Sequence, residues 1–278
     1  MHDKGVLLHA HGTKPINYIN QAIWCAEQIK WHLKLPVALV TSETTGVKKY
    51  PEGRHFSHLI RVKPSNTTQT RKFLDGDIYK QVTWDNHSRI DSYDLTPFKE
   101  TIVMDTDLIV GNNNLLKCFD TNKDFLINNE SIYVNSQHRK DLRIRYMNNF
   151  IKMYWATCFY FKKTKWTNDF FLLLKHIKLN YEFYRFAYGI VETKYRNDYA
   201  FTIAMHMMNN FTARPNDRSL PIKIFYVTDK DKVLSYKHGI WKFALPKDDG
   251  SFFRCNVKGS NMHVMNKFAL DRIINEYQ

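Results

Sequence analysis

Residues 97–110 read Pro97-Phe98-Lys99-Glu100-Thr101-Ile102-Val103-Met104-Asp105-Thr106-Asp107-Leu108-Ile109-Val110, and this stretch decides the fold. The apolar run from Ile102 to Met104 predicts a buried strand that ends at two aspartates. Side chains two residues apart in an extended chain point the same way, so Asp105 and Asp107 could hold one hard cation such as Mg²⁺ or Mn²⁺. The alternative is a surface turn, in which aspartates bond to their own backbone.

A βαβ unit is predicted at the start of the chain. Residues 5–10 form an apolar run typical of a strand, and apolar residues at helical spacing predict a helix over residues 18–32. The continuous apolar segment 37–40 is typical of a second strand in a parallel sheet. In such units ligands bind at the carboxyl ends of the strands, which points to the loop after Ala10.

The bulk composition indicates a globular enzyme-sized domain. The chain has 278 residues, 44% of them hydrophobic and 15% aromatic, which is enough for a substantial core. It has no run of eighteen apolar residues and no apolar segment behind its N-terminus, so we expect no transmembrane segment. The four cysteines are scattered and form no C-x-x-C pair, which predicts reduced thiols and a cytoplasmic protein.

The charge of the chain points to a polyanionic partner. The net charge is +14, from 41 basic and 27 acidic residues. Much of the excess lies between Arg139 and Arg196, where thirteen Lys or Arg residues accompany four acids. Nucleic acid, an anionic membrane surface or an acidic glycan would fit such a region. A generically basic, solvated surface is the alternative.

The remaining segments are predicted from their periodicity. We expect strands over residues 58–62, 125–127 and 154–161, with a helix over 167–180 after the last of these. A further helix is predicted within residues 79–92, carrying Lys80 and Arg89. His206 lies among methionines on an apolar helical segment, which favours a core histidine.

The opening stretch resembles the GT-A glycosyltransferases, which use nucleotide sugars and a divalent cation. In that family a Pro-Phe-x-x-Thr segment, three apolar residues and Asp-x-Asp place a metal-binding acid pair at the end of a central strand. Residues 97–107 fit this pattern position by position. The resemblance implies an α/β fold, with residues 1–278 forming a single GT-A-like domain around a Rossmann-like, mostly parallel central sheet flanked by helices.

The resemblance also implies which residues hold the donor. In the family the end of the first strand and its loop receive the nucleotide base and ribose, and the matching positions here are Ala10, His11, Gly12 and Tyr18. Either Lys80 or Arg89 would reach the diphosphate, although a solvated helical face explains both equally well. Of His9 and His11 we expect only one to face the ligand; His11 is favoured, with core packing as its alternative.

Glycogenin-like members of the family end their fold with a histidine that is a third metal ligand and a lysine that holds the diphosphate. His263 and Lys267 match these two roles in chemistry, and a surface histidine is the alternative for His263. Asp198 resembles the family's acidic residue at the head of a buried helix. It could touch the donor sugar or acceptor, or it could cap the helix.

Together these resemblances imply a hexosyl- or pentosyltransferase that moves a sugar from a nucleoside diphosphate donor, UDP by expectation, to a hydroxyl. The cation, Mn²⁺ or Mg²⁺, would stabilise the leaving diphosphate, with Asp105, Asp107 and His263 as ligands and Lys267 assisting. Asp198 or Asp141 would be the base of an inverting reaction. Residues 1–130 would form the nucleotide-sugar half and residues 131–278 the acceptor half.

The acceptor is inferred from the basic, aromatic region 138–196. Its cations are interleaved with aromatic residues, a pattern that fits a phosphate-tracking groove with stacking surfaces; those considered are Tyr146, Phe150, Tyr154, Trp155, Trp166, Tyr181 and Tyr184. We therefore expect DNA as acceptor, as in phage enzymes that glycosylate hydroxymethylated bases such as 5-hydroxymethylcytosine, acting in the host cytoplasm. The rivals are a transferase for a surface glycan or lipopolysaccharide, helped by a short amphipathic segment at 268–274, and a non-catalytic nucleic-acid-binding protein.

Overall fold

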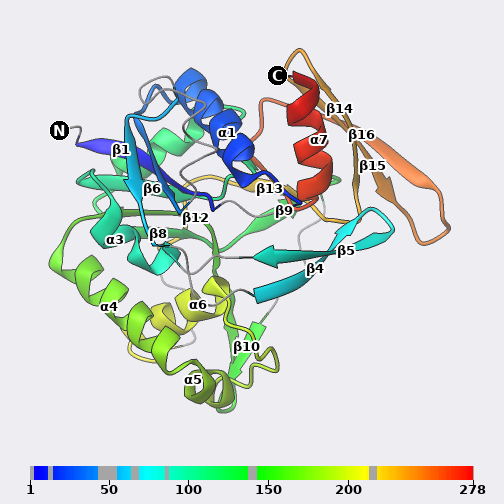
Figure 1. Ribbon diagram of the computed structural model, residues 1–278. Coiled ribbons are helices and arrows are strands. Elements are labelled where there is room, and N and C mark those ends of the chain that lie inside the picture. Colours follow the sequence, from blue (N-terminus) through cyan, green and yellow to red (C-terminus); the bar gives the residue numbers. More distant parts are fainter. Residues whose placement is uncertain are drawn as a thin grey trace.

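The computed structural model describes residues 3–11, 15–42, 55–63, 69–84, 88–136, 143–212 and 218–277. At its centre is a six-stranded sheet with the strand order β3-β2-β1-β6-β12-β8 (Figure 1). Five strands run in one direction and β12 alone runs against them. In that order the strands are His58–Arg61, Val37–Thr41, Lys4–His9, Glu100–Met104, Trp155–Lys162 and Phe125–Asn128.

Helices cover both faces of this sheet. Helix α1 (Tyr18–His32) packs on the face to which Ile102 of β6 points, and α4 (Lys165–Leu179) and α6 (Asn197–Met208) pack on the face to which Val103 points. Alternate side chains of a strand point to opposite faces, so a sheet covered on both sides needs an unbroken apolar run. The predicted α/β fold, with a mostly parallel sheet flanked by helices, is confirmed.

The Pro-Phe-x-x-Thr part of the opening stretch has a packing role. The Phe98 ring is buried and fills the space beside Gly5 on β1, where an added Cβ would lie 2.4 Å from the ring. The buried Thr101 and Thr96 hydroxyls lie 2.8 Å apart and form a hydrogen bond. These contacts fix the start of β6 against β1, so that the aspartates at its far end have a defined position.

A second sheet brings the C-terminal part of the chain to those aspartates. Its order is β7-β17-β13-β9, with strands at Leu108–Ile109, Met262–Val264, Ile224–Val227 and Ser131–Tyr133. β17 runs antiparallel to β7 and places His263 opposite Leu108. Gly111 permits this approach, because a Cβ there would lie 2.3 Å from the carbonyl oxygen of Ser260.

The helix predicted within residues 79–92 is wrong. Strand β5 (Ile78–Trp84) instead forms a hairpin with β4 (Gln69–Asp75), joined by a turn in which Gly76 has φ +67°. Val82 and Phe73 point inward to a small core of their own, while Gln81 and Thr83 are exposed. This alternation has the period of a strand, and the short elements η1 (Ser88–Asp91) and α3 (Ser92–Leu95) follow only after it.

The C-terminal helix α7 (Lys267–Tyr277) lies beside α1 (Figure 1). Its apolar residues Leu270, Ile273 and Ile274 are buried in a cluster with Trp24 of α1. The amphipathic segment predicted at 268–274 therefore faces the protein core, and its apolar side is not available to a membrane. Among the described residues, no helix is long and apolar enough to cross a bilayer.

The remaining elements lie at the periphery. They are η2 (Asn114–Asp120), α5 (Tyr181–Ala187), a two-stranded sheet of β10 (Arg143–Tyr146) and β11 (Asn149–Lys152), and a three-stranded antiparallel sheet of β14 (Lys232–Lys237), β15 (Ile240–Pro246) and β16 (Phe252–Lys258). The three-stranded sheet lies on the opposite side of the molecule from α4 and α5 (Figure 1). All four cysteines are free thiols, and Cys25, Cys118 and Cys158 are buried.

Candidate functional site

A cavity of about 330 Å³ opens at the carboxyl ends of β1 and β6, a size that suits a small ligand. The first residues of β12 also reach it, because β12 runs against its neighbours. Nine of the ten predicted site residues line this cavity, and the tenth, Gly12, lies outside the described residues. The nine are Ala10, His11, Tyr18, Arg89, Asp105, Asp107, Asp198, His263 and Lys267.

The two aspartates of the acid pair converge through a turn and not along an extended strand. β6 ends at Met104, and the backbone N–H of Leu108 donates a 3.1 Å hydrogen bond to the carbonyl of Asp105. The N–H of Asp105 is held by Thr157 of β12 at 2.9 Å. Ligand atoms of Asp105, Asp107 and His263 lie within 4.8 Å of one another. Two carboxylates and an imidazole are a donor set that Mn²⁺ accepts.

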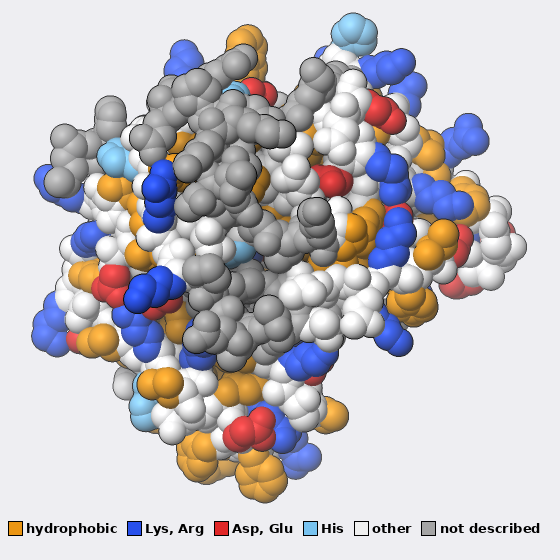
Figure 2. Space-filling model, viewed as in Figure 1, with side chains coloured by type: hydrophobic (Ala, Val, Ile, Leu, Met, Phe, Trp, Pro, Cys, Tyr) orange, Lys and Arg blue, Asp and Glu red, His pale blue; other side chains and the backbone are white. Residues whose placement is uncertain are grey.

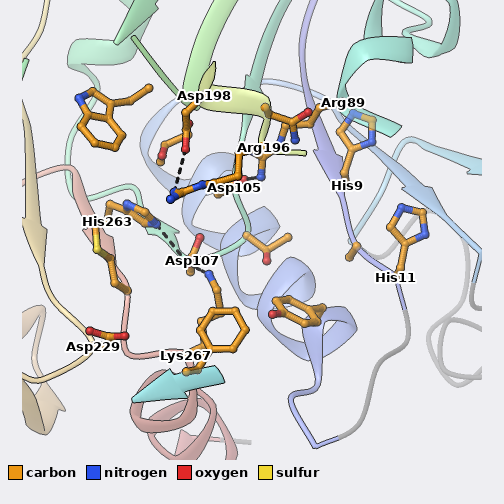
Figure 3. A pocket seen from close by; sticks show the side chains of 18 residues that line it. His9, His11, Arg89, Asp105, Asp107, Arg196, Asp198, Asp229, His263 and Lys267 are labelled. Atoms are coloured by element: carbon orange, nitrogen blue, oxygen red, sulfur yellow. Dashed lines mark hydrogen bonds and ion pairs between the residues drawn. The ribbon is translucent and has the colours of Figure 1, made fainter. Parts of the chain in front are cut away.

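Asp107 is the most enclosed charge of the cavity, with only 1% of its surface exposed. Its carboxylate lies between the Lys267 ammonium, with which it forms an ion pair, and His263 Nε2 at 3.2 Å (Figure 3). Burial raises the pKa of Asp107, but Lys267 and His263 outweigh burial and hold this pKa below its usual range. Asp107 is therefore an anion whose charge is already balanced by two cavity residues.

Asp105 has a different partner, the buried guanidinium of Arg89, with which it forms an ion pair. Arg89 also donates a 3.1 Å hydrogen bond to the carbonyl of Ala156 on β12. Burial lowers the pKa of Arg89, and the nearby carboxylates of Asp198 and Asp107 oppose that shift. Arginine stays charged in proteins despite this shift, so the Arg89 guanidinium can hold the Asp105 carboxylate in place.

Asp198, in the first turn of α6, is a third acid of the cavity, and its partner is an arginine. Its Oδ2 is 3.2 Å from Arg196 Nη2, and its Oδ1 accepts a 3.0 Å hydrogen bond from the backbone N–H of Ala156 (Figure 3). The capping interpretation of Asp198 is wrong, because Arg196 occupies the N-cap position of α6 and Asp198 bonds to a different element. Its carboxylate is among the groups that line the cavity.

The first strand contributes two histidines to the cavity, although only one was expected. His9 Nε2 lies 2.9 Å from the Ser92 hydroxyl, and His11 Nδ1 lies 2.9 Å from the Ser42 hydroxyl. Burial, with smaller contributions from Arg89 and His11, lowers the pKa of His9 well below its usual value. Tyr18, at the start of α1, has its ring centroid 6.0 Å from the Lys267 ammonium.

Lys80 is not among the described residues that line the cavity. It lies on β5, where its ammonium is 2.7 Å from Asp75 Oδ2 and 4.5 Å from the Phe268 ring centroid. Of the two cations proposed to reach the diphosphate, the structure brings only Arg89 to the acid pair. His206 is a core histidine as predicted, 3% exposed and 2.9 Å from the Tyr188 hydroxyl.

Trp155, Arg196 and Asp229 also line the cavity, and sequence reasoning assigned none of them to the metal or donor site. Asp229 follows β13, whose apolar run could have been recognised as a strand end. Its carbonyl and carboxylate accept hydrogen bonds from Gly76 and Leu74, which ties the β4–β5 hairpin to the cavity. Trp155 had no such signal, because the direction of β12 is not readable from its sequence.

The basic region 138–196 has only part of the stacking surface expected of it: Phe150 is exposed, but three of the expected tyrosines are not. Residues 138–142, including Asp141, lie outside the described part of the chain. Tyr154, Tyr181 and Tyr184 are all less than 9% exposed and pack in the core, so they cannot stack on bases. Several of its cations are also paired with acids: Lys165 with Asp169, Lys175 with Asp94, Arg185 with Glu182 and Arg196 with Asp198.

Comparisons with known proteins give distant likenesses of backbone only. No protein-family model matches the sequence, and no curated protein matches it. The glycosyltransferase GlyE of Streptococcus pneumoniae is similar at 11% identity and a TM-score of 0.42, covering 79% of this chain and 45% of GlyE. The galactosyltransferase LgtC, solved with donor and acceptor sugar analogs, is similar at 11% identity and a TM-score of 0.42, covering 72% of this chain and 70% of LgtC.

A third similar structure is the bifunctional IspDF of Campylobacter jejuni, at 10% identity and a TM-score of 0.38, covering 73% of this chain and 47% of IspDF. The chain thus matches less than half of the length of GlyE and of IspDF. TM-scores below 0.5 leave the function to be inferred from the cavity itself.

Proposed function

We propose that this chain is a metal-dependent glycosyltransferase that moves a hexosyl or pentosyl group from a nucleoside diphosphate sugar, with UDP as the expected nucleotide, to a hydroxyl. The observation that carries the proposal is the convergence of Asp105, Asp107 and His263 at the end of a central strand. Lys267 adds a compact positive charge at the same carboxylate, within a cavity large enough for part of a nucleotide sugar.

The chain's own residues divide the work of the cavity. Asp105, Asp107 and His263 would hold Mn²⁺ or Mg²⁺, which supplies the charge that stabilises a departing diphosphate. Lys267 is placed to leave Asp107 and bind phosphate oxygens. Arg89 holds Asp105 in a fixed orientation. Ala10, His11 and Tyr18, continued by Gly12, would receive the base and ribose.

Asp198 is the residue we propose for the acceptor side. Arg196 and the Ala156 N–H hold its carboxylate in a fixed orientation, as a general base requires. Within one domain, residues 1–130 would hold the donor and residues 131–278 the acceptor. The buried free thiols support a reducing compartment, and we place the reaction in the cytoplasm, that of the host if a phage encodes the chain.

We propose DNA carrying a hydroxymethylated base, such as 5-hydroxymethylcytosine, as the acceptor. The net charge of +14 supports a polyanionic substrate. A surface glycan or lipopolysaccharide is the rival acceptor, but α7 buries the apolar side that would have rested on a membrane. A binding protein without catalysis is the other rival, and it would have no use for the three converging metal ligands.

The test is transfer of radiolabelled sugar from a panel of UDP-sugars, with Mn²⁺, to hydroxymethylcytosine-containing and unmodified DNA. We expect label on the modified DNA only, and its loss in Asp107→Asn. Asp120→Asn, an exposed carboxylate on η2, is the matched control. Calorimetry with Mn²⁺ alone gives a second readout, in which Asp107→Asn should lose binding and Asp120→Asn should keep it.

Metal-dependent hydrolysis of the donor without DNA labelling would keep the transferase and move the acceptor to a glycan or lipid. Equal Mn²⁺ binding by both variants would contradict the metal site. Absence of both transfer and hydrolysis, with intact DNA binding, would favour the non-catalytic binding protein.

A further inference from the structure

The three-stranded sheet of β14, β15 and β16 has two chemically different faces. Its inner face carries Trp241, Phe243 and Leu245 of β15, which are buried with α1 and α7. Directly opposed residues of an antiparallel sheet share a face, so the register assigns the outer face without ambiguity. On the outer face, residues of β14, β15 and β16 that lie directly beside one another form three rows. These rows are Lys237-Ile240-Lys258, Ser235-Lys242-Asn256 and Lys232-Ala244-Arg254, followed by the pair Pro246-Phe252.

Five cations and no carboxylate stand on this outer face: Lys232, Lys237, Lys242, Arg254 and Lys258. All five are exposed. Within the described part of the chain, none of the five forms an ion pair with an acid, and Lys232 instead lies 4.4 Å from the Phe252 ring centroid. Figure 2 shows Lys and Arg side chains gathered along the edge of the molecule where Figure 1 places these strands.

The register spaces these cations evenly. Four occupy the corners of the three rows and Lys242 occupies the centre, so that no two are directly opposite on neighbouring strands. Like charges directly opposite would destabilise the sheet, and this pattern avoids that cost while it keeps the positive field. From strand and row spacings the five cover roughly 10 by 14 Å. Asp248 and Asp249 lie outside the pattern, in the turn between β15 and β16.

The sheet is joined to the cavity at both ends. The chain leaves the cavity wall at Asp229, three residues before β14, and returns from β16 to His263 on β17. A polyanion bound to the outer face would therefore be held by the same segment that supplies the proposed third metal ligand. In the basic region 138–196, which the sequence favoured, the β10–β11 hairpin carries a smaller group of three cations on one face, Arg143, Arg145 and Lys152, and several other cations are paired with acids.

We infer that the outer face of β14–β16 is the docking surface for the phosphate backbone of duplex DNA. The choice of DNA as the occupant rests on the proposed function. The assignment of the surface rests on the register and the charges of the sheet. Lys, Arg, Ser and Asn are the side chains that contact phosphates, and all four types stand in the three rows. An anionic membrane would instead favour inserted apolar groups, and Phe252 is the only large exposed aromatic on this described face.

The test is binding of a fluorescein-labelled 24-base-pair duplex, measured by anisotropy at 50 to 200 mM NaCl. Two phosphate contacts fewer should lower the slope of log K against log[salt] by about 2 in Lys242→Glu/Arg254→Glu and weaken binding about 50-fold at 100 mM salt. Lys242→Gln/Arg254→Gln should give a smaller loss in the same direction. This Gln variant replaces the Glu variant as the test if charge reversal disturbs folding, which a thermal unfolding measurement would show.

Two matched double variants make the same change of charge elsewhere. Lys34→Glu/Lys117→Glu changes two exposed cations that belong to neither basic region and should leave DNA affinity within about threefold. Arg143→Glu/Arg145→Glu changes β10 in the rival region. Loss of DNA binding in the β10 variant, with normal binding in the sheet variant, would overturn the inference.

Anionic vesicles of phosphatidylglycerol provide the remaining comparison. Tight vesicle binding without duplex binding would also overturn the inference, in favour of a membrane partner. Either result would leave donor hydrolysis by the cavity unaffected, so failure of the docking surface and failure of the proposed transferase give different results.

Discussion

The cavity and the outer face of β14–β16 are both rich in charge, but they balance it in opposite ways. In the cavity three of the four acids have a cation beside them: Asp105 has Arg89, Asp107 has Lys267, and Asp198 has Arg196. On the outer face five cations stand together with no acid among them. Buried charges must be paired to be tolerated, whereas exposed charges are stabilised by water and can remain free for a partner.

This difference in charge pairing predicts what the cavity and the outer face can each bind. A cavity of paired charges binds a small charged ligand by exchange, because a metal or phosphate replaces one internal partner with another. A surface of unpaired cations binds by releasing counterions from a polyanion, so its affinity depends steeply on salt. The two regions should therefore respond differently to mutation and to ionic strength.

The largest effect is expected from Asp107→Asn. Loss of the carboxylate removes the ligand that His263 and Lys267 both contact, and we expect sugar transfer to fall by at least about 10³-fold. Initial rates with saturating donor and Mn²⁺ measure this. Retention of more than a tenth of the activity would show that the paired charges of the cavity are structural.

Salt should separate the two regions almost as strongly. If all five cations of the outer face contact phosphates, duplex affinity should fall about 500-fold between 50 and 200 mM NaCl. Donor and metal binding in the enclosed cavity should change by no more than about threefold over the same range. Anisotropy and calorimetry on the same preparation provide both numbers. If duplex binding and donor or metal binding depended equally on salt, the proposed difference between the outer face and the cavity would be contradicted.

Lys267→Met tests whether the lysine and the metal compete for the Asp107 carboxylate. Without the ammonium, Asp107 is free for the metal, and Mn²⁺ affinity in the absence of donor should rise about tenfold. Transfer should nevertheless fall about 100-fold, because the lysine is then missing from the phosphates. Unchanged Mn²⁺ affinity would show that the lysine and the metal do not compete for Asp107.

The smallest effect concerns Asp75, which is paired like a cavity residue but lies outside the cavity. Its 8% exposed carboxylate accepts two 2.8 Å hydrogen bonds from Arg272 and one of 2.7 Å from Lys80. Arg272, followed by Lys80 and against the effect of burial, lowers the pKa of Asp75 to about 2. A depressed carboxyl pKa stabilises the folded state above the unfolded pKa, and this stabilisation is lost as the pH falls toward 2.

Asp75→Asn should therefore lower the free energy of unfolding by about 2 kcal/mol at pH 7. The difference from the unmodified protein should shrink between pH 4 and pH 2, which urea titrations at several pH values would detect. Asp249→Asn, in an exposed turn, is the control. A difference that persists undiminished at pH 2 would contradict the ion-pair explanation.

Much of the site could be predicted because its residues follow strand ends. The acid pair after β6 and the residues after β1 are in the cavity for the reason that the sequence suggested. The hairpin of β4 and β5 was missed because helical spacing was inferred from Lys80, Trp84 and Arg89, although the buried Val82 and the turn at Gly76 follow the period of a strand. Lys80 was consequently assigned to the wrong neighbourhood.

The basic surfaces show the limit of counting charges along the chain. Residues 139–196 hold the larger local excess, yet the tertiary structure pairs Lys175 with Asp94 and buries Tyr184. β14–β16 hold a smaller excess, but strand alternation turns Trp241, Phe243 and Leu245 of β15 inward and leaves the cations on the outer face. The pairing partner of a charge lies far away in sequence and is fixed only by folding.

By itself, the sequence determined the mostly parallel α/β fold and the position of the acid pair, because apolar periodicity and strand ends are local properties of the chain. Only the tertiary structure decided that β17 returns His263 to Asp107, that Arg89 supports Asp105, and that the free cations stand on β14–β16. Those facts depend on the register and direction of strands that are distant in sequence, and packing alone sets them.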